Sequence, residues 1–458
     1  MLSLAISLLN GGLGFFSIWF IASHYSLQSY GQYSLVVMTG MWMNMALFSW
    51  LRLGLLRYGM SAQERGLIVA LYGAMTMVAL VVVLPAFLAW RPSMIAVVSV
   101  MLAIAIGLYD AVLAWTRVCL NFSSYFLVAF IRPIFFLISL LLIFFLKLRF
   151  ELVFAILLLS YLLPLAWRNA YSGLSGWRGS ALRHADWRGV AKYGLTASFA
   201  GTLGYGYFAL NKLVVSHFSE AVAFGAFALC ADIAFQVISM LFGAFHIRMF
   251  SLLLAKHGGE VAQGEGQEFS RYRHVLIALF ALLLSASIYY RLAFGALFLK
   301  GNDGLGGYLL AWCVLLSGLY FLRVNYLDYM YHFTKRLKSL AASAVVMVVL
   351  GGGGALIGFY AWGLKGMLLL SALILLLQNV VVNNYCRRFG VGLRWSEVFF
   401  FVASVIAVAC LPAASSDILS PLFFIQSVLF VSVFLSVLVF FNILETRKLL
   451  LDFLKREP

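Results

Sequence analysis

The sequence predicts an all-α polytopic membrane protein with about 14 transmembrane helices, arranged as two parallel six-helix lobes around a central cavity plus two C-terminal helices. Three observations carry this prediction. The chain of 458 residues is 64% hydrophobic and only 10% charged, a composition that cannot form a water-facing surface. Its charges come in short bursts between apolar runs that are long enough to cross a bilayer. One short motif also occurs twice in the same orientation.

The apolar runs define the predicted spans. Each is roughly 18–25 residues long, the length that an α-helix needs to cross about 30 Å of hydrocarbon. The spans cover residues 3–22, 32–50, 67–90, 93–116, 123–146, 150–167, 193–215, 221–245, 274–290, 305–322, 339–360, 364–385, 396–413 and 421–443. The connection between the ninth and tenth spans is itself apolar enough to dip back into the bilayer.

Basic residues are distributed unequally between the two sides of these spans. With the N-terminus placed in the cytoplasm, the inner loops hold 24 of the 32 Lys and Arg residues and the outer loops hold six. This bias follows the positive-inside rule, so it supports an even number of spans with both termini in the cytoplasm. The net charge of +16 is therefore largely a topology signal, and it does not require nucleic acid as a partner.

The repeated motif indicates an internal duplication. SHYSLQSYGQYSL begins at Ser23, and SHFSEAVAFGAFAL begins at Ser216. Each copy links an outward-going span to an inward-going one, and six spans separate them, so the two halves are parallel repeats. We expect Gly31 and Gly225 to permit close helix packing in the two hairpins. The alternative interpretation is that both are ordinary hairpin turns with interfacial aromatic residues.

The duplication and the charge bursts together divide the chain. The predicted parts are an N-terminal lobe of residues 1–167, a basic cytoplasmic linker of 168–192, a C-terminal lobe of 193–390, and 391–458 with two extra helices and a basic tail. Hydrophilic stretches reach only about 25 residues, which argues against membrane enzymes with a soluble catalytic domain and against receptors with a large ectodomain. Parallel repeats are typical of alternating-access carriers with a site between the lobes.

Three segments resemble one family of transporters. They are SLQSYGQYSLVVMTGMWMNMALFSWLRLGLLRYG, LNKLVVSHFSEAVAFGAFALCADIAF, and WGLKGMLLLSALILLLQNVVV with the preceding LGGGGAL. They are similar to bacterial polysaccharide, or lipid-linked oligosaccharide, flippases: the Wzx-like polysaccharide transporter family of the multidrug/oligosaccharidyl-lipid/polysaccharide exporter superfamily. The resemblance covers about residues 1–390 and consists of diffuse patterns. It departs from the family at Asn211 and Lys212, where an acidic residue is common.

This resemblance implies a carrier in the bacterial inner membrane and not an enzyme. Its substrate would be a polyprenyl-diphosphate-linked glycan, moved for O-antigen, capsule or exopolysaccharide assembly. Membrane lipids, proton or sodium coupling, and a polysaccharide polymerase or assembly protein are the further partners implied, without a cofactor or a metal site. The alternatives are a multidrug or small-cation exporter of the same superfamily and a non-transporting membrane subunit of a polysaccharide assembly complex.

Ionisable residues at depth are the sharpest site candidates, because an unpaired charge in lipid costs several kcal/mol. Asp232 lies roughly 16 Å into the eighth span, Arg132 roughly 14 Å into the fifth, and Asp110 roughly 10 Å into the fourth. Asp110 and Arg132 can meet because their spans are consecutive and antiparallel, so one interpretation is a structural ion pair. The alternative is that Arg132 lines the substrate cavity and Asp110 takes part in ion coupling. Asp232 is either a carboxylate that takes a proton or cation during coupling or a buried acid paired with a neighbouring helix.

Four further cations lie nearer the membrane surfaces. Arg52, Arg57 and Arg248 come at the predicted inner ends of the second and eighth spans. They are either inner-mouth ligands for a diphosphate or ordinary positive-inside residues. Lys212 comes near the outer end of the seventh span, where we expect it to extend its ammonium group to the surface. If it faces the cavity instead, it receives the diphosphate at the outward-facing stage.

Overall fold

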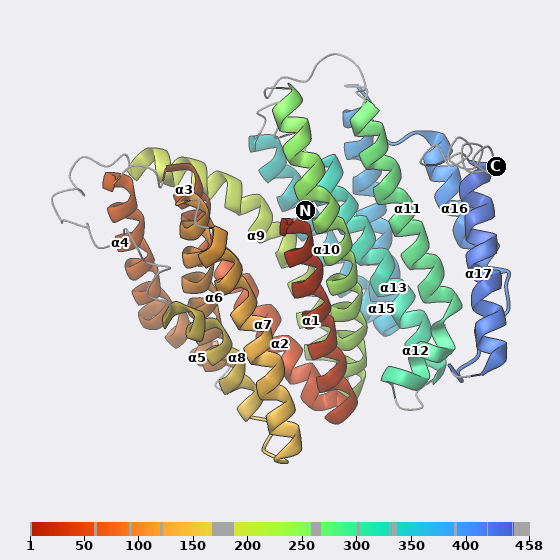
Figure 1. The fold of residues 1–458 in the computed structure, drawn as a ribbon, viewed down its shortest axis with the longest axis horizontal. Helices are drawn as coiled ribbons and strands as arrows, with labels where there is room; N and C mark the ends of the chain where they lie inside the picture. The colour runs from red at the N-terminus through yellow and green to blue at the C-terminus, as the bar shows by residue number, and fades with distance from the viewer. Residues whose placement is uncertain are drawn as a thin grey trace. The chain divides into compact units, whose positions relative to one another are not determined.

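The computed structural model describes residues 2–58, 62–90, 94–119, 122–166, 187–257, 267–299, 303–328, 331, 337–388, 392–418, 420–441 and 443. Over these residues the chain is helical and contains no strand. The helices are α1 (Leu2–His24), α2 (Leu27–Leu47), α3 (Ser49–Tyr58), α4 (Ala62–Val78), η1 (Ala79–Val83), α5 (Leu84–Trp90), α6 (Met94–Val118), α7 (Phe122–Phe145), α8 (Leu152–Leu162), η2 (Leu163–Ala166), α9 (Trp187–Phe218), α10 (Ala221–His257), α11 (Gln267–Tyr289), α12 (Arg291–Phe298), α13 (Asp303–Leu322), η5 (Arg323–Leu327), α15 (Leu337–Arg387), α16 (Trp395–Ala409) and α17 (Pro421–Phe440) (Figure 1).

Many of these helices have the length and composition of membrane spans. Eight described helical segments are long and apolar enough to cross a bilayer, or nine if α2 and α3 form one bent span. One of the eight is the 50-residue segment Lys338–Arg387, which contains two predicted spans. Two shorter apolar helices cover residues 152–166 and 395–409. The all-α polytopic class is confirmed, whereas the count of 14 stays a prediction.

Contacts divide the chain into two compact units. The N-unit comprises residues 12–228 and 337–353, and the C-unit comprises residues 1–11, 229–336 and 354–458. Both units therefore draw on α1, α10 and α15. The predicted lobe boundaries at 168–192 stay a prediction, because most of that linker lies outside the described residues.

In the N-unit, α2 packs against both α6 and α9. The indole nitrogen of Trp42 donates to the Thr202 carbonyl at 3.2 Å, and the Thr202 hydroxyl donates to the Met45 carbonyl at 3.1 Å. A buried apolar cluster that includes Phe48 and Trp115 continues this packing toward α4 and α6. These reciprocal bonds join α2 to α9 within the apolar interior.

The second predicted span differs from its expected form. We expected one helix over residues 32–50, but the chain bends by 51° after Leu47 and continues as α3. The Ser49 hydroxyl donates to the Met45 carbonyl at 2.6 Å and the Trp50 indole donates to the Leu47 carbonyl at 2.9 Å. Serine bonds of this kind, to the carbonyl four residues earlier, often bend helices. Arg52 is consequently a helix residue rather than a loop residue.

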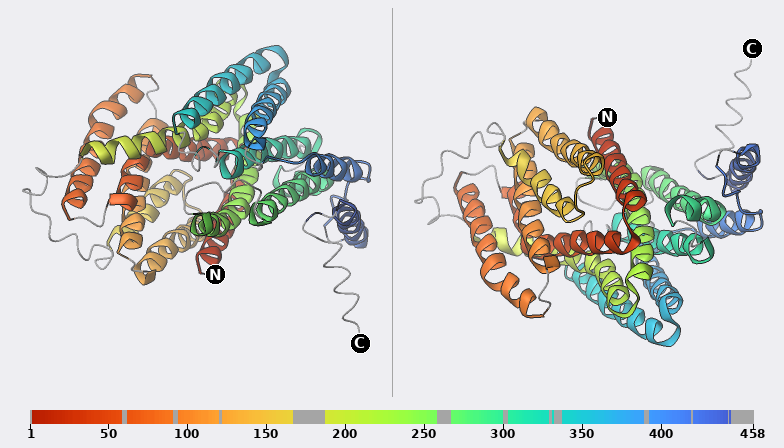
Figure 2. Two further views of the ribbon diagram at one scale, coloured as in Figure 1. Left: turned by 90° about the horizontal axis from the view of Figure 1, so that it is seen from above. Right: turned by 90° about the horizontal axis from the view of Figure 1, so that it is seen from below.

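In the C-unit, α11 packs against α13 and α16, and α16 packs against α17. The two C-terminal helices lie side by side in both views of Figure 2, where they are dark blue. Helix α15 is broken at Trp362 and at Gly363, whose φ is +63°, so it forms a helical hairpin as the predicted spans 339–360 and 364–385 require. At the turn, a Cβ on Gly358 would lie only 2.4 Å from the Gly366 carbonyl oxygen.

The apolar connection after the ninth predicted span forms the short helix α12. Its buried side includes Ala293, Phe294 and Phe298, and it packs against α13. Together with α10, α11, α13 and part of the C-terminal segment, α12 lines an apolar cavity of about 430 Å³ in the C-unit. The segment therefore behaves as an apolar packing element, in keeping with its composition.

Candidate substrate site in the N-unit

Arg132 is the central cation of the N-unit. It lies on α7 immediately before Pro133, and its guanidinium carbon sits 3.9 Å from the centre of the Tyr161 ring on α8. The Tyr109 ring on α6 lies 5.9 Å from the same carbon and meets the Tyr161 ring edge-on at 5.5 Å. The Tyr109 hydroxyl donates to the Val128 carbonyl at 3.4 Å, which holds that ring in place. Three helices thus build one cation–π site.

The guanidinium of Arg132 has an N–H group that is available for a further hydrogen bond. Its Nε is buried and has no hydrogen-bond partner among the described residues. Within the same residues, no carboxylate lies within ion-pair distance of Arg132. Arginine offers five N–H donors in a planar fork that matches phosphate oxygens. This geometry can receive an anion without first breaking a salt bridge.

Asp110 pairs with a different arginine from the one we expected. Its carboxylate accepts a hydrogen bond from Arg52 Nη1 at 2.9 Å, whereas the expected partner was Arg132. The bend between α2 and α3 explains the change, because it places Arg52 on a helix that packs against α6. The acid of this region is therefore already neutralised by Arg52, and Arg132 adds a net positive charge.

Lys212 is buried rather than extended to the surface. Only 6% of the residue is exposed, and its Nζ donates to the Ser34 hydroxyl at 2.9 Å. The expected surface position was wrong because α9 packs directly against α2, which carries Ser34. Lys212 thus joins the helix that leads into the second hairpin to the helix that leaves the first.

The remaining sequence candidates are not brought into this cluster. Asp232 is half-buried on the part of α10 that belongs to the C-unit. The side chains of Arg57 and Arg248 lie outside the described part of the structure. The roles of these three residues stay predictions.

The two copies of the repeated motif pack against each other within the N-unit. A Cβ on Gly31 would lie 2.9 Å from a ring carbon of Phe224 and 3.2 Å from the Gly225 Cα. A Cβ on Gly225 would lie only 1.9 Å from the Leu27 carbonyl oxygen. The expectation that both glycines permit close helix packing is confirmed. The two hairpins therefore contact each other at the predicted outer end of the N-unit.

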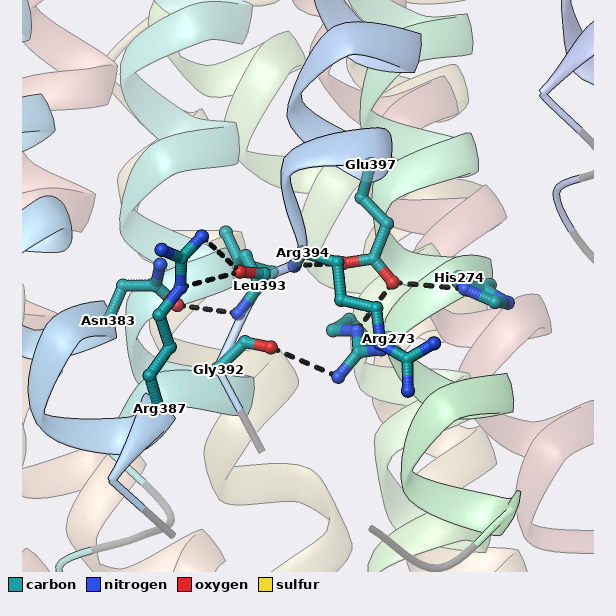
Figure 3. Close-up of polar contacts among 8 residues, drawn as sticks. All are labelled: Arg273, His274, Asn383, Arg387, Gly392, Leu393, Arg394 and Glu397. Atoms are coloured by element: carbon teal, nitrogen blue, oxygen red, sulfur yellow. Dashed lines mark hydrogen bonds and ion pairs between the residues drawn. The ribbon is translucent and has the colours of Figure 1, made fainter. Parts of the chain in front are cut away.

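A second charged network, in the C-unit, was missed by the sequence reasoning. Arg273 and Glu397 are fully buried, and Arg273 Nε donates to the Glu397 carboxylate at 2.6 Å (Figure 3). His274 Nε2 lies 2.9 Å from the same carboxylate oxygen, and the Arg394 backbone N–H donates to the other oxygen at 2.8 Å. The available signal was Glu397 itself, a single acid in the first turn of an apolar helix.

The same network fixes the segment between α15 and α16. Arg387 donates two hydrogen bonds to the Leu393 carbonyl at 2.9 and 2.7 Å, and the Leu393 N–H donates to Asn383 at 2.6 Å (Figure 3). Arg273 Nη1 donates to the Gly392 carbonyl at 3.1 Å. These bonds tie the first of the two C-terminal helices to α11 and to the end of α15.

Comparison with solved structures identifies two proteins that share the fold of this chain. No family model matches the sequence, and no curated protein matches it either. The solved structure described as "Lipid II flippase MurJ, inward closed conformation" superposes with a TM-score of 0.69 at 12% identity, over 98% of this chain and 100% of that chain. The chain has the MurJ fold. A match over 98% of the chain includes both C-terminal helices.

A multidrug transporter shows a similar but less extensive match to the same fold. The structure described as an "Inward-facing conformation of a multidrug resistance MATE family transporter of the MOP superfamily" superposes with a TM-score of 0.62 at 13% identity. It covers 83% of this chain and 94% of that one. Both likenesses concern the fold, and both confirm the all-α polytopic class predicted from composition.

Proposed function

We propose that this chain is a flippase that moves polyprenyl-diphosphate-linked oligosaccharide units across the bacterial inner membrane by alternating access, for O-antigen, capsule or exopolysaccharide assembly. Both termini would lie in the cytoplasm. The observation that carries the proposal is Arg132, a cation inside the N-unit that stacks on tyrosines and has no carboxylate partner among the described residues. The full-length likeness to a lipid II flippase adds support, because lipid II is a lipid-linked substrate.

The charge of the site favours an anionic substrate. A cation within a membrane span is costly, so its presence there points to a functional role. A diphosphate would supply the missing negative charge through bidentate hydrogen bonds to the guanidinium. Arg52 could add to this field only by sharing its bond to Asp110. We therefore assign Arg132 the main contact with the diphosphate, and Arg52, Arg57, Lys212 and Arg248 secondary positions along its path.

Coupling to an ion is the second part of the proposal. Asp110 forms the ion pair with Arg52. We assign the binding of a proton or sodium ion to Asp232, an ionisable residue within a predicted span. Its half-buried position on α10 supports this role, because a carboxylate there can exchange an ion with water when the conformation changes. Polysaccharide polymerases or assembly proteins would then be partners on the outer side.

A multidrug or small-cation exporter is the alternative, favoured by the MATE transporter likeness. Export of organic cations would be served by an acidic, apolar cavity. The N-unit instead combines Arg132 and Lys212 with an aspartate that is already paired. This balance supports the anionic substrate.

The test replaces Arg132 in a bacterium that depends on the chain for surface glycan. We expect Arg132→Ala to lower glycan export at least tenfold and Arg132→Lys to retain only part of it, because lysine keeps the charge but loses the planar fork. The matched control is Arg149→Ala, which removes an exposed arginine from a predicted outer loop. Membrane levels are measured in parallel. Normal glycan export in Arg132→Ala, or loss of organic-cation export instead, would overturn the proposal.

A further inference from the structure

A small apolar cavity in the N-unit has no role in the proposed transport path. Its volume is about 210 Å³, and it lies among α3, α4, α6 and η2. Leu55, Ala111, Trp115 and Leu165 contribute apolar walls, and the ring of Tyr72 completes the lining. The space is smaller than the roughly 300–1,000 Å³ of pockets that bind drug-sized ligands. It can hold part of a chain or a single ring.

The cavity lies at the predicted cytoplasmic end of the N-unit. Trp115 comes two residues before Arg117, at the inner end of the fourth predicted span. Tyr72 comes near the start of the third span, and Leu165 comes near the end of the sixth. All three therefore belong to the inner-leaflet side of the bilayer, close to the level of the lipid headgroups.

The mouth of the cavity faces lipid. Val69 lines it and is 40% exposed, and further along the same predicted span Met77 and Val81 are 59% and 63% exposed. An apolar exposed face on a membrane-spanning helix is in contact with acyl chains. A molecule that fills the cavity can therefore enter from the inner leaflet.

One residue of the lining, Tyr72, has a hydroxyl group without a hydrogen-bond partner among the described residues. Tyr72 is only 5% exposed. Water is a poor occupant, because a buried water needs two to four polar partners. An unfilled apolar cavity destabilises a protein in proportion to its volume. The best occupant is apolar with one oxygen that accepts a hydrogen bond.

We propose that this cavity binds the ester end of an acyl chain from an inner-leaflet phospholipid, with the Tyr72 hydroxyl donating to the ester carbonyl. The first carbons of the chain fill the space beside Ala111 and Trp115. The hydroxyl is itself buried, so the chain end displaces neighbouring atoms as it enters. The site serves a structural lipid of the N-unit and does not depend on which substrate is transported.

The test is photolabelling of the purified full-length protein in vesicles of phosphatidylethanolamine and phosphatidylglycerol. A trace of phosphatidylethanolamine carries a diazirine close to the acyl ester, and labelled peptides are identified by mass spectrometry. We expect labels on the peptides around Tyr72 and Trp115. Ala111→Phe fills the cavity and should lower that labelling at least tenfold. Ala74→Phe adds the same ring to an exposed position of α4 and should leave it unchanged.

A second comparison isolates the hydrogen bond and does not require a large side chain to be accommodated. An ether-linked analogue of the probe lacks the carbonyl, so wild-type protein should be labelled about fivefold less by the ether than by the ester. Tyr72→Phe should remove that difference. Equal labelling of Ala111→Phe and wild type would overturn the proposal. So would the absence of phospholipid labelling on the wild-type peptides around Tyr72 and Trp115.

Discussion

The ion pair between Arg52 and Asp110 determines which cation of the N-unit remains available to a substrate. Its 2.9 Å bond satisfies the aspartate, and the side chains are 37% and 22% exposed. Solvent therefore screens the pair, and its contribution to stability is modest. Its larger effect is to leave Arg132 as a cation held by aromatic rings instead of by an acid.

Charge reversal at this pair tests the arrangement. We expect Arg52→Ala and Asp110→Asn each to lower the free energy of unfolding by about 1 kcal/mol, the range of partly exposed ion pairs. The exchanged pair Arg52→Asp with Asp110→Arg should recover stability but not glycan export, because the cation moves to another helix. Thermal unfolding of the purified protein measures the first effect, with Lys365→Ala as an exposed control. Failure of the exchanged pair to recover stability would contradict the assignment.

The positions of Asp110 and Arg132 in apolar runs identify them as charges inside the membrane, but not their partners. Burial of Lys212, Arg273 and Glu397 does not follow from the sequence pattern. The partners depend on helix rotation and on the bend after Leu47, neither of which follows from hydropathy. Depth alone predicted Asp110 beside Arg132, whereas the bend brings Arg52 there first.

Helix α16 depends on a charge that no solvent reaches. Glu397 binds Arg273 with both side chains fully buried, and it also accepts the backbone N–H of Arg394. Removal of one member of such a pair leaves an uncompensated buried charge. Loss of either side chain should therefore weaken the link between α16 and α11.

Glu397→Gln should lower the free energy of unfolding by about 3–5 kcal/mol, the range for breaking a buried pair. Limited proteolysis between α15 and α16 should accelerate together with this loss. Glu151→Gln is the control, since Glu151 is exposed and its side chain does not cap α8. A thermal unfolding midpoint for Glu397→Gln equal to that of the control would contradict the proposed role.

Element boundaries show where composition stops being informative. The break of α15 at Trp362 and Gly363 falls between two predicted spans, because glycine and a local loss of hydropathy coincide there. Helix α10, by contrast, runs from Ala221 to His257, well past the predicted end at 245. A helix continues into water wherever backbone bonds and side-chain packing allow, so hydropathy gives the span but not the helix end.

At the scale of the whole molecule, the chain passes between the N-unit and the C-unit four times. The crossings fall at 11/12, 228/229, 336/337 and 353/354. Two of them fall at Gly11-Gly12 and within the run Gly351–Gly354. Glycine in a helix interior lowers helix stability by about 1 kcal/mol relative to alanine, so these positions locally weaken α1 and α15.

Alanine at these crossings should stiffen the connections between the units. A Cβ on Gly12 or on Gly353 meets no atom within 4 Å, so Gly12→Ala and Gly353→Ala introduce no clash. We expect both to raise the free energy of unfolding by roughly 0.5–1 kcal/mol and to slow glycan transport several-fold. Gly73→Ala is the control, because Gly73 is equally unobstructed but lies inside α4. Equal transport rates in all three variants would contradict a hinge role for the crossings.

The contact between the two hairpins has a consequence for how this chain changes over generations. The two turns have similar sequences, but their contact makes the two glycines unequal. Gly225 faces the backbone oxygen of Leu27, which cannot rotate away, while Gly31 faces the ring of Phe224, which can. Selection should therefore hold glycine more strictly in the second copy than in the first.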